Sequence, residues 1–356
     1  MSSIRVRLAG ALVCLGMASG ILISLPLWLS RRDFPFTPPW TPLELLVLPP
    51  PLDLLLLFAF FGALALAAIT GHRLAFGACF VLALLLALPD LQRWQPWFYQ
   101  YAFMLGALAF VLKDALGTLR LIVAATYIFS GLQKVHASFF EDGMQLFLEP
   151  FGLAQELSWI TLCAPFAEAA VGLGLLFSRT RSIAALAAVG MHAFLLLALG
   201  PLGQDFNPVV WPWNVVMASV VMLLFFRTAE DTTIVPSSAY GFAVFLLFLV
   251  MPVFGLFGAW PPYLSASLYS QNTKEAYVFD GAGYSSVSSL TYSTTETPAY
   301  PAEAVFFSAA NRACERHGEK LGRARPVMEV FSRPDLFTGE RSSRIYFCKD
   351  VRMGTR

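Results

Sequence analysis

Three ionisable side chains lie inside or at the edge of long apolar stretches, where such groups are costly and often mark function. Lys134 ends one stretch, Glu168 lies in the middle of the next, and His192 lies centrally in the one after that. A lysine held against apolar surface has its neutral form favoured and can act as a base. A buried carboxylate must be paired or protonated, and a neutral imidazole both donates and accepts. Together the three residues predict one polar pocket in which protons are held or moved.

Each of the three has a structural alternative. Lys134 can extend to the membrane interface, Glu168 can brace two helices, and His192 can be a core histidine with its hydrogen bonds satisfied. The sequence leaves open whether Glu168 pairs with Lys134 or with His192. It contains no second close histidine and no paired acidic ligands, so we predict no metal site.

Residues near Lys134 extend the candidate site. On a helix, Tyr127, Ser130 and Gly131 share a face with Lys134, because they lie three, four or seven positions away. A glycine there allows another helix or a flat ligand to approach closely. We therefore predict that Tyr127 and Gly131 contribute to substrate binding.

A stiff polar loop supplies four further substrate-binding candidates. The segment 200–214 contains Asn207, Trp211, Trp213 and Asn214 together with three prolines. The asparagine side chains are suited to orient a ligand. The two tryptophans alternatively form part of an interfacial aromatic belt.

The composition is that of a membrane protein with a soluble end. Of the 356 residues, 57% are hydrophobic and 13% are charged, about half the usual charged share. Residues 265–356 hold 22 of the 47 charged residues. The net charge of +1 argues against binding to nucleic acid. We predict an all-α polytopic membrane bundle in residues 1–262 and a small α+β extracytoplasmic domain in residues 263–356.

The bundle must position the polar residues, and its spans follow from apolar stretches of about 20 residues. We predict about nine transmembrane helices, at 8–29, 51–70, 74–89, 97–112, 119–134, 158–178, 183–200, 211–227 and 239–259. The first is interpreted as an uncleaved span, because its apolar run is too long for a typical signal peptide. Lysine and arginine are more frequent in the segments that share a side with the N-terminus, which predicts a cytoplasmic N-terminus and an extracytoplasmic C-terminal domain.

The C-terminal residues 263–356, the tail, show a sequence pattern of helix and strands. Ala302–Glu319 has apolar residues at helical spacing, and 284–301 is predicted to be a loop. Pro326–Phe331 and Arg344–Phe347 are predicted to be the two apolar strands of a hairpin. Cys314 and Cys348 are the only cysteines of the tail. An extracytoplasmic location would allow them to form a disulfide that closes a loop of about 35 residues. Two free buried thiols are the alternative.

The segment Phe129-Ser-Gly-Leu-Gln-Lys-Val-His-Ala-Ser-Phe-Phe-Glu-Asp-Gly resembles a segment of the vitamin K-dependent γ-glutamyl carboxylases. It also resembles their bacterial relatives with a horizontally transferred transmembrane domain (HTTM) and the DoxX-like proteins. Met191-His192 is similar to the Met-His segment of that family. The resemblance covers roughly residues 50–260 and implies an integral protein of the bacterial inner membrane.

The resemblance also implies a chemistry. In the carboxylases a lysine deprotonates a quinol, reduced vitamin K, and the matching position here is Lys134. The implied substrate is an extracytoplasmic protein. Gln133 stands where the family has a first lysine, a phenylalanine follows where it has tryptophan, and its large lumenal domain is absent from the tail. The DoxX-like relatives instead imply a non-enzymatic membrane subunit that holds an extracytoplasmic redox partner.

Overall fold

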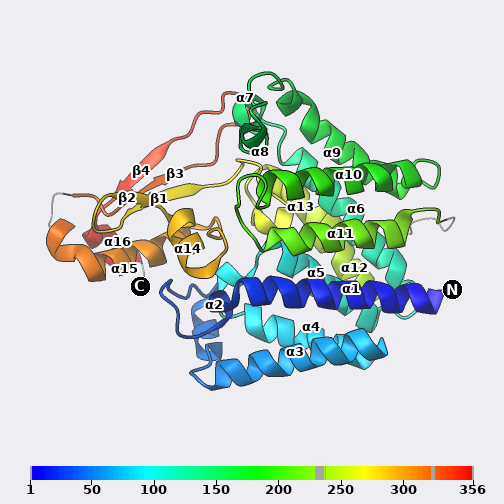
Figure 1. Cartoon of the computed structure of the whole chain (residues 1–356). Coiled ribbons are helices and arrows are strands. Elements are labelled where there is room, and N and C mark those ends of the chain that lie inside the picture. The colour runs from blue at the N-terminus through cyan, green and yellow to red at the C-terminus, as the bar shows by residue number, and fades with distance from the viewer. Residues whose placement is uncertain (1, 229–235, 237, 322–324, 355–356) are drawn as a thin grey trace.

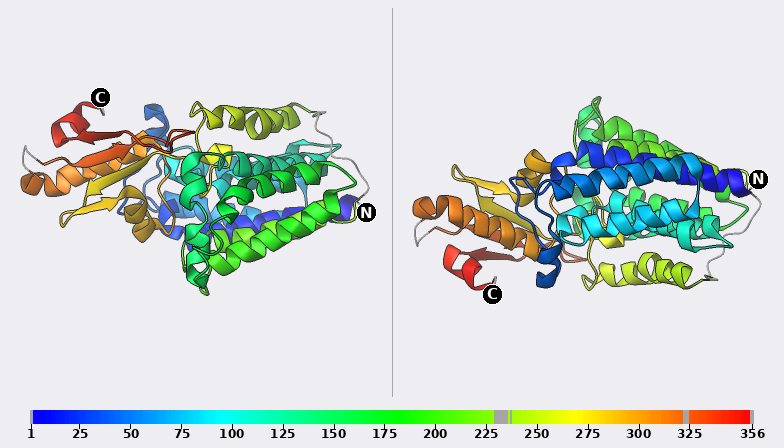
Figure 2. Two further views of the ribbon diagram at one scale, coloured as in Figure 1. Left: turned by 90° about the horizontal axis from the view of Figure 1, so that it is seen from above. Right: turned by 90° about the horizontal axis from the view of Figure 1, so that it is seen from below.

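The computed structural model describes residues 2–228, 236, 238–321 and 325–354, and it is mostly helical. Figure 1 shows a bundle of roughly parallel helices with a smaller domain of sheet and helices, the cap, at one end of it. The N-terminus lies at the end of the bundle far from the cap, and the C-terminus lies in the cap (Figures 1 and 2).

Within the described residues, five helical segments are long and apolar enough to cross a membrane. They are α1 from Ile4 onward, α3, α6, α10 and the continuous run Ala239–Leu256. Three shorter helices, α4, α9 and α11, are also apolar. The helices of the bundle are α1 (Ser2–Ile23), α2 (Leu25–Trp28), α3 (Leu52–Thr70), α4 (Arg73–Ala87), α5 (Pro96–Phe110), α6 (Ala115–Leu132), α7 (Ala137–Asp142), α8 (Gln145–Leu148), α9 (Ile160–Leu176), α10 (Arg181–Leu199), α11 (Val210–Phe225), α12 (Ala239–Phe245) and α13 (Met251–Leu256).

Local sequence explains where these helices begin and end. Asp114 caps α6 by accepting a hydrogen bond from Gly117 N at 2.9 Å, and Gly71 ends α3 with a φ of 64°. The predicted first span is displaced: α1 ends at Ile23 instead of continuing to residue 29. The chain then breaks at Ser24 and resumes as the short α2, in which Pro26 occupies the first turn.

The last helix of the bundle is interrupted. A π-helical turn, η4 (Leu246–Val250), joins α12 to α13, and Pro252 is the second residue of α13. Proline has no backbone N–H to donate, so the regular hydrogen-bond ladder is disturbed at this point. Phe248 and Pro252, from this irregular turn and its neighbour, line the main cavity described below.

Helix α6 is the most enclosed of the five long segments, with 78% of its apolar window buried, whereas α3 has 28% buried. Helices α5, α9 and α11 contact α6, and α10 packs between α9 and α11. Helix α1 packs against α3, α5 and α11. Lys134 therefore lies at the end of the central helix of the bundle.

Short 3-10 turns and the elements of the cap complete the structure. The turns are η1 (Thr41–Leu46), η2 (Leu91–Arg93), η3 (Glu149–Phe151) and η5 (Tyr263–Ser265). The cap contains β1 (Glu275–Phe279), β2 (Tyr284–Ser286), β3 (Met328–Phe331), β4 (Ser343–Tyr346), α14 (Val287–Thr295), α15 (Glu303–Leu321) and α16 (Cys348–Gly354). The strands form an antiparallel sheet in the order β2-β1-β3-β4.

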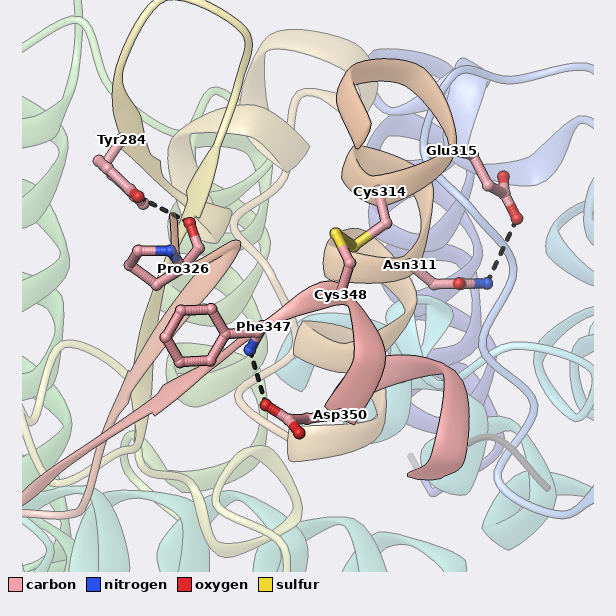
Figure 3. Close-up of a disulfide and its surroundings, with 8 residues drawn as sticks. All are labelled: Tyr284, Asn311, Cys314, Glu315, Pro326, Phe347, Cys348 and Asp350. Carbon is pink, nitrogen blue, oxygen red and sulfur yellow. Dashed lines mark hydrogen bonds between the residues drawn. A yellow bond between two sulfur atoms is a disulfide. The ribbon is translucent and has the colours of Figure 1, made fainter. Parts of the chain in front are cut away.

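The cap confirms part of what its sequence predicts. Val305, Phe306 and Ala309 of α15 are buried against the sheet, as their helical spacing indicates. Cys314 and Cys348 form a disulfide that joins α15 to α16 (Figure 3). The prediction that 284–301 is a loop was wrong, because this segment forms β2 and α14.

Helix α14 was missed because its sequence is rich in serine and threonine. Ser286 caps it by accepting a hydrogen bond from Ser289 N at 3.0 Å. Val287, Thr291 and Thr295 recur every four residues and are buried. The buried threonine hydroxyls donate to backbone carbonyls one turn earlier, so they enter the core with their hydrogen bonds made.

Candidate functional site

A largely apolar cavity of about 540 Å³ lies at the cap end of the bundle. Its walls come from α5, α6, α9, α10 and α11, and Phe248 and Pro252 close one side. On the cap side it is bounded by residues of α7 and α8 and by the segment 263–269. Six of the predicted site residues line it, namely Tyr127, Lys134, Glu168, His192, Trp213 and Asn214.

Lys134 and Glu168 form an ion pair in the cavity wall. Lys134 Nζ lies 2.7 Å from Glu168 Oε2, and it also donates to Ser130 Oγ at 2.8 Å and Ser130 O at 3.0 Å. An ammonium has three hydrogens, and each has an acceptor here. The lysine thus folds back along α6 and does not extend to an interface. Of the two alternatives for Glu168, the structure forms the pair with Lys134.

Glycines bring the two partners together. A Cβ atom on Gly131 of α6 would lie 2.4 Å from Pro165 O and 2.6 Å from Ala169 N of α9. A Cβ on Gly172 of α9 would lie 2.6 Å from Ile128 N of α6. The two backbones can approach this closely only because both positions lack a side chain. Gly131 therefore allows α9 to pack closely against α6, and it does not line the cavity.

A second polar cluster lies deeper along α6. The Tyr127 hydroxyl is 2.5 Å from His192 Nε2, and His192 Nδ1 is 2.7 Å from Asn214 Oδ1. Asn214 Nδ2 donates to Val210 O at 2.7 Å, which assigns Oδ1 as an acceptor. In a neutral imidazole, His192 Nδ1 then carries the hydrogen and Nε2 accepts from the Tyr127 hydroxyl. The three side chains come from α6, α10 and α11.

The two clusters occupy two depths of one cavity. Tyr127 and Lys134 are seven residues apart, which is two helical turns or about 10 Å along the α6 axis. Both residues line the cavity, as do the apolar side chains of Ala125 and Phe129 between or beside them. A ligand that fills the cavity can therefore meet the ion pair near its outer end and the Tyr127 hydroxyl near its inner end.

Sequence reasoning missed a third polar group in the wall. Trp213 Nε1 donates to Gln100 Oε1 at 2.8 Å, and Gln100 Nε2 donates to Thr126 Oγ1 at 3.1 Å. Gln100 is buried in α5, at a position inside the predicted span 97–112. An uncharged amide inside an apolar span was an available signal for Gln100, but the prediction within the spans rested on ionisable residues and their helical neighbours.

Tyr99 is the second missed residue. Its ring stacks on Phe248 with 4.7 Å between ring centroids, and it lines the cavity. Its hydroxyl is buried and has no hydrogen-bond partner among the described residues. An unpaired buried hydroxyl is costly, so a ligand that supplies a partner would gain from doing so.

Asn207 and Trp211 lie outside the cavity lining. Trp211 Nε1 donates to Leu199 O at 3.0 Å and thereby fastens the loop between α10 and α11. Asn207 Nδ2 donates to the Tyr269 hydroxyl at 2.7 Å, and Tyr269 lines the cavity on the cap side. Asn207 thus orients a wall residue from behind.

His136 ties the outer wall to the cap. Its Nε2 lies 2.7 Å from Ser270 O, and its Nδ1 accepts from Phe139 N at the start of α7. Burial lowers the pKa of His136 below its ordinary value of 6.5, and the charges of Arg341 and Arg333 act in the same direction, against the hydrogen bond to Ser270. His136 is therefore held neutral where α7 meets the segment that closes the cavity.

No group of three or more histidine, cysteine, aspartate or glutamate side chains suited to a metal ion occurs within the described parts of the chain. The polar chemistry of the cavity rests on one ion pair, one tyrosine–histidine–asparagine chain and several neutral donors. Such groups can bind hydroxyl or carbonyl groups of a ligand and hold or accept a proton.

Comparison with protein-family models, with curated proteins and with solved structures found no match to this chain.

Proposed function

We propose that the chain is an integral membrane protein with nine crossings and a cytoplasmic N-terminus. The long apolar helices support the membrane location, and successive helices of the bundle run in alternate directions (Figure 1). Arg5, Arg73 and Lys113 lie in segments at the end of the bundle away from the cap. Excess lysine and arginine mark the cytoplasmic side, so the cap is extracytoplasmic in this proposal. A bacterial inner membrane follows from the resemblance noted above.

The cavity is proposed to bind a lipid-soluble quinol, of which reduced vitamin K is one example. One observation carries the proposal: an apolar cavity of about 540 Å³ contains an ion pair and a buried tyrosine–histidine pair at two depths. The volume lies in the range of small-molecule sites, and few convergent polar groups in an apolar wall are typical of them. A quinol is a flat apolar ring with a hydroxyl at each of two opposite edges, which suits this arrangement.

The proposed chemistry is proton acceptance from a ligand hydroxyl. When bound, a quinol supplies a weakly acidic hydroxyl group. Only Oε2 of Glu168 is engaged by Lys134 among the described contacts, so Oε1 remains available to accept a hydrogen bond or a proton. Lys134 keeps a positive charge beside the site and favours negative charge there. The role of base that the resemblance gives to Lys134 is thus proposed for the Lys134–Glu168 pair.

At the inner end, the Tyr127 hydroxyl donates to His192 and keeps its lone pairs for the ligand. Asn214 holds the imidazole in one tautomer. Tyr127 and His192 are proposed to orient the second polar group of the ligand. Trp213, fixed by Gln100, supplies a flat face in the same wall.

Binding can be measured on the purified chain in nanodiscs, with menadione reduced to its quinol and kept anaerobic as the probe, and with quenching of tryptophan fluorescence as the signal. We expect saturable quenching that weakens about tenfold or more in Glu168→Gln and in Tyr127→Phe. Leu186→Ala, on the exposed face of α10 and outside the cavity lining, is the matched control. Quenching that is linear in menadione, or equal in all variants, would refute the proposed site.

A non-enzymatic membrane subunit is the second candidate. It is favoured by the three satisfied donors of Lys134, because such a saturated pair also serves to brace α6 against α9. In that case the chain would copurify with a stoichiometric extracytoplasmic redox partner and bind no quinone. Retention of that partner by the Glu168→Gln and Tyr127→Phe variants would favour the second candidate over the first.

A further inference from the structure

The outer face of the cap sheet carries an apolar hollow with a carboxylate at its centre. The hollow has a volume of about 490 Å³, and its lining includes Tyr277, Tyr284, Glu329, Phe331 and Ile345. Helix α15 and its apolar residues pack on the opposite face of the sheet, in the core of the cap. The hollow and the cavity of the bundle have no lining residue in common, so they are separate sites.

Strand register places Glu329 among apolar neighbours. Glu329 of β3 lies directly opposite Tyr277 of β1 and Ile345 of β4. Phe331 follows two residues later on the same face, and its ring lies 5.9 Å from that of Tyr277. The side chains of directly opposed residues are close enough to touch. The carboxylate is therefore flanked on both strands by large apolar side chains.

Tyr284 closes another side of the hollow. Its hydroxyl donates to Pro326 O at 2.7 Å, so the ring reaches from β2 toward the start of β3 (Figure 3). Tyr284 and Tyr277 are both exposed. Aromatic rings around a carboxylate attract a cation through their faces as well as through the charge.

Glu329 has no partner of its own. It is half-buried, and no hydrogen bond or ion pair is made by its side chain within the described residues. The neighbouring Glu275 differs, because it pairs with Arg341 at 3.2 Å. A half-buried carboxylate without a partner gains most from a cation that reaches it through the apolar rim.

The edge of the sheet adds a second feature. Strand β4 is the last in the sheet order and pairs with β3 on one side only. An edge strand presents unpaired N–H and C=O groups to a further strand. The hollow reaches this edge through Ile345, which is 56% exposed.

We infer that the cap binds an extended segment of a partner polypeptide beside β4, with a lysine or arginine of that segment paired to Glu329. Adjacent strands are about 4.8 Å apart, so a residue on the added strand lies about 10 Å from Glu329 across β4. Long cationic side chains span that distance above Ile345, whereas short polar side chains do not. Backbone pairing along β4 supplies affinity and the Glu329 hollow supplies selectivity.

The test uses the full chain in nanodiscs and a fluorescein-labelled peptide, Thr-Val-Thr-Lys-Thr-Val-Thr, with its Lys-to-Gln counterpart. Fluorescence anisotropy gives both affinities. The expected result is at least tenfold tighter binding of the lysine peptide. This preference should vanish in Glu329→Gln and persist in Glu340→Gln, an exposed carboxylate in the loop between β3 and β4.

Two further arms identify the occupant. Ile345→Pro removes an edge N–H without changing Glu329, and it should weaken both peptides by a similar factor. Equal affinity of the two peptides for the native chain, or a lysine preference that survives Glu329→Gln, would overturn the inference. So would displacement of the peptide by millimolar phosphocholine combined with no effect of Ile345→Pro, since the hollow would then hold a choline headgroup. None of these outcomes depends on quinol binding in the bundle.

Discussion

The two oxygens of the Glu168 carboxylate differ in their contacts at the outer end of the cavity. One of its oxygens accepts from Lys134, while the other has no partner among the described residues. The lysine is saturated by Ser130 and Glu168 together. A saturated ammonium stabilises charge better than it removes a proton, so the available carboxylate oxygen is the proposed acceptor.

Substitutions of Lys134 and Glu168 distinguish a structural role of the ion pair from a role in ligand binding. Lys134→Met alone should destabilise the protein by about 3–5 kcal/mol, because it leaves a carboxylate without its partner in an apolar wall. The double variant Lys134→Met with Glu168→Leu should recover most of that stability, since no uncompensated charge remains. Thermal unfolding in one detergent measures both effects, with the exposed Glu141→Gln as control.

The double variant also tests the role of the pair in ligand binding. If the pair is only a brace, the double variant should bind menadione as the native chain does. The proposed function requires that binding stays weak even where stability has returned. A stable double variant with native affinity would contradict it.

At the scale of elements, the close contact of α6 and α9 positions the ion pair. Gly131→Ala should separate the helices, because the added Cβ would meet backbone atoms of α9 within 2.4–2.6 Å. We expect a loss of about 1–3 kcal/mol of stability and weaker menadione binding. Gly62→Ala is the control, since a Cβ at Gly62 of α3 would meet nothing within 4 Å.

A second prediction at this scale concerns His136, which joins α7 to the segment closing the cavity. Its folded-state pKa is lowered, so the unfolded chain takes up a proton first as the pH falls through about 6.5. The stability that neutral His136 contributes is therefore complete above that pH and is lost below it. The temperature at the midpoint of thermal unfolding of the native chain should therefore decrease as the pH is lowered from 7.5 to 5.5.

The variant His136→Asn isolates this contribution, because asparagine retains a side-chain acceptor at the N-cap of α7 and does not titrate. Its unfolding midpoint should fall less over the same pH interval. An identical fall in both proteins would show that other groups cause the pH dependence.

At the scale of the whole molecule, the hydrophobic pattern predicted most of the bundle. The predicted spans 51–70 and 158–178 correspond within two residues to α3 and α9, because long apolar runs bounded by charge or proline have few alternatives. The end of α1 and the helix α14 were missed. The short α2 after this end begins with a proline in its first turn, and α14 depends on the capping serine Ser286, and hydrophobicity records neither of these.

The sequence predicted several residues of the candidate site, but it did not predict which of their side chains contact one another. Lys134, Glu168 and His192 stand out because charge is rare in apolar spans. Their pairing depends on which helices touch, and this follows from the glycines that let α6 and α9 meet. Gln100 and Tyr99 were not predicted, since neutral polar residues in a span resemble interfacial or core positions until the cavity is seen.

The central claim is that a quinone-type ligand occupies the cavity between α6, α9 and α10. It is tested most directly by photolabelling the full chain in nanodiscs with an azido-naphthoquinone and mapping the labelled peptides. The account predicts label on α6 and α10 near Tyr127 and Met191, and loss of that label with excess menadione in its quinol form. Label confined to lipid-facing positions such as those of α3, unchanged by the competitor, would contradict it.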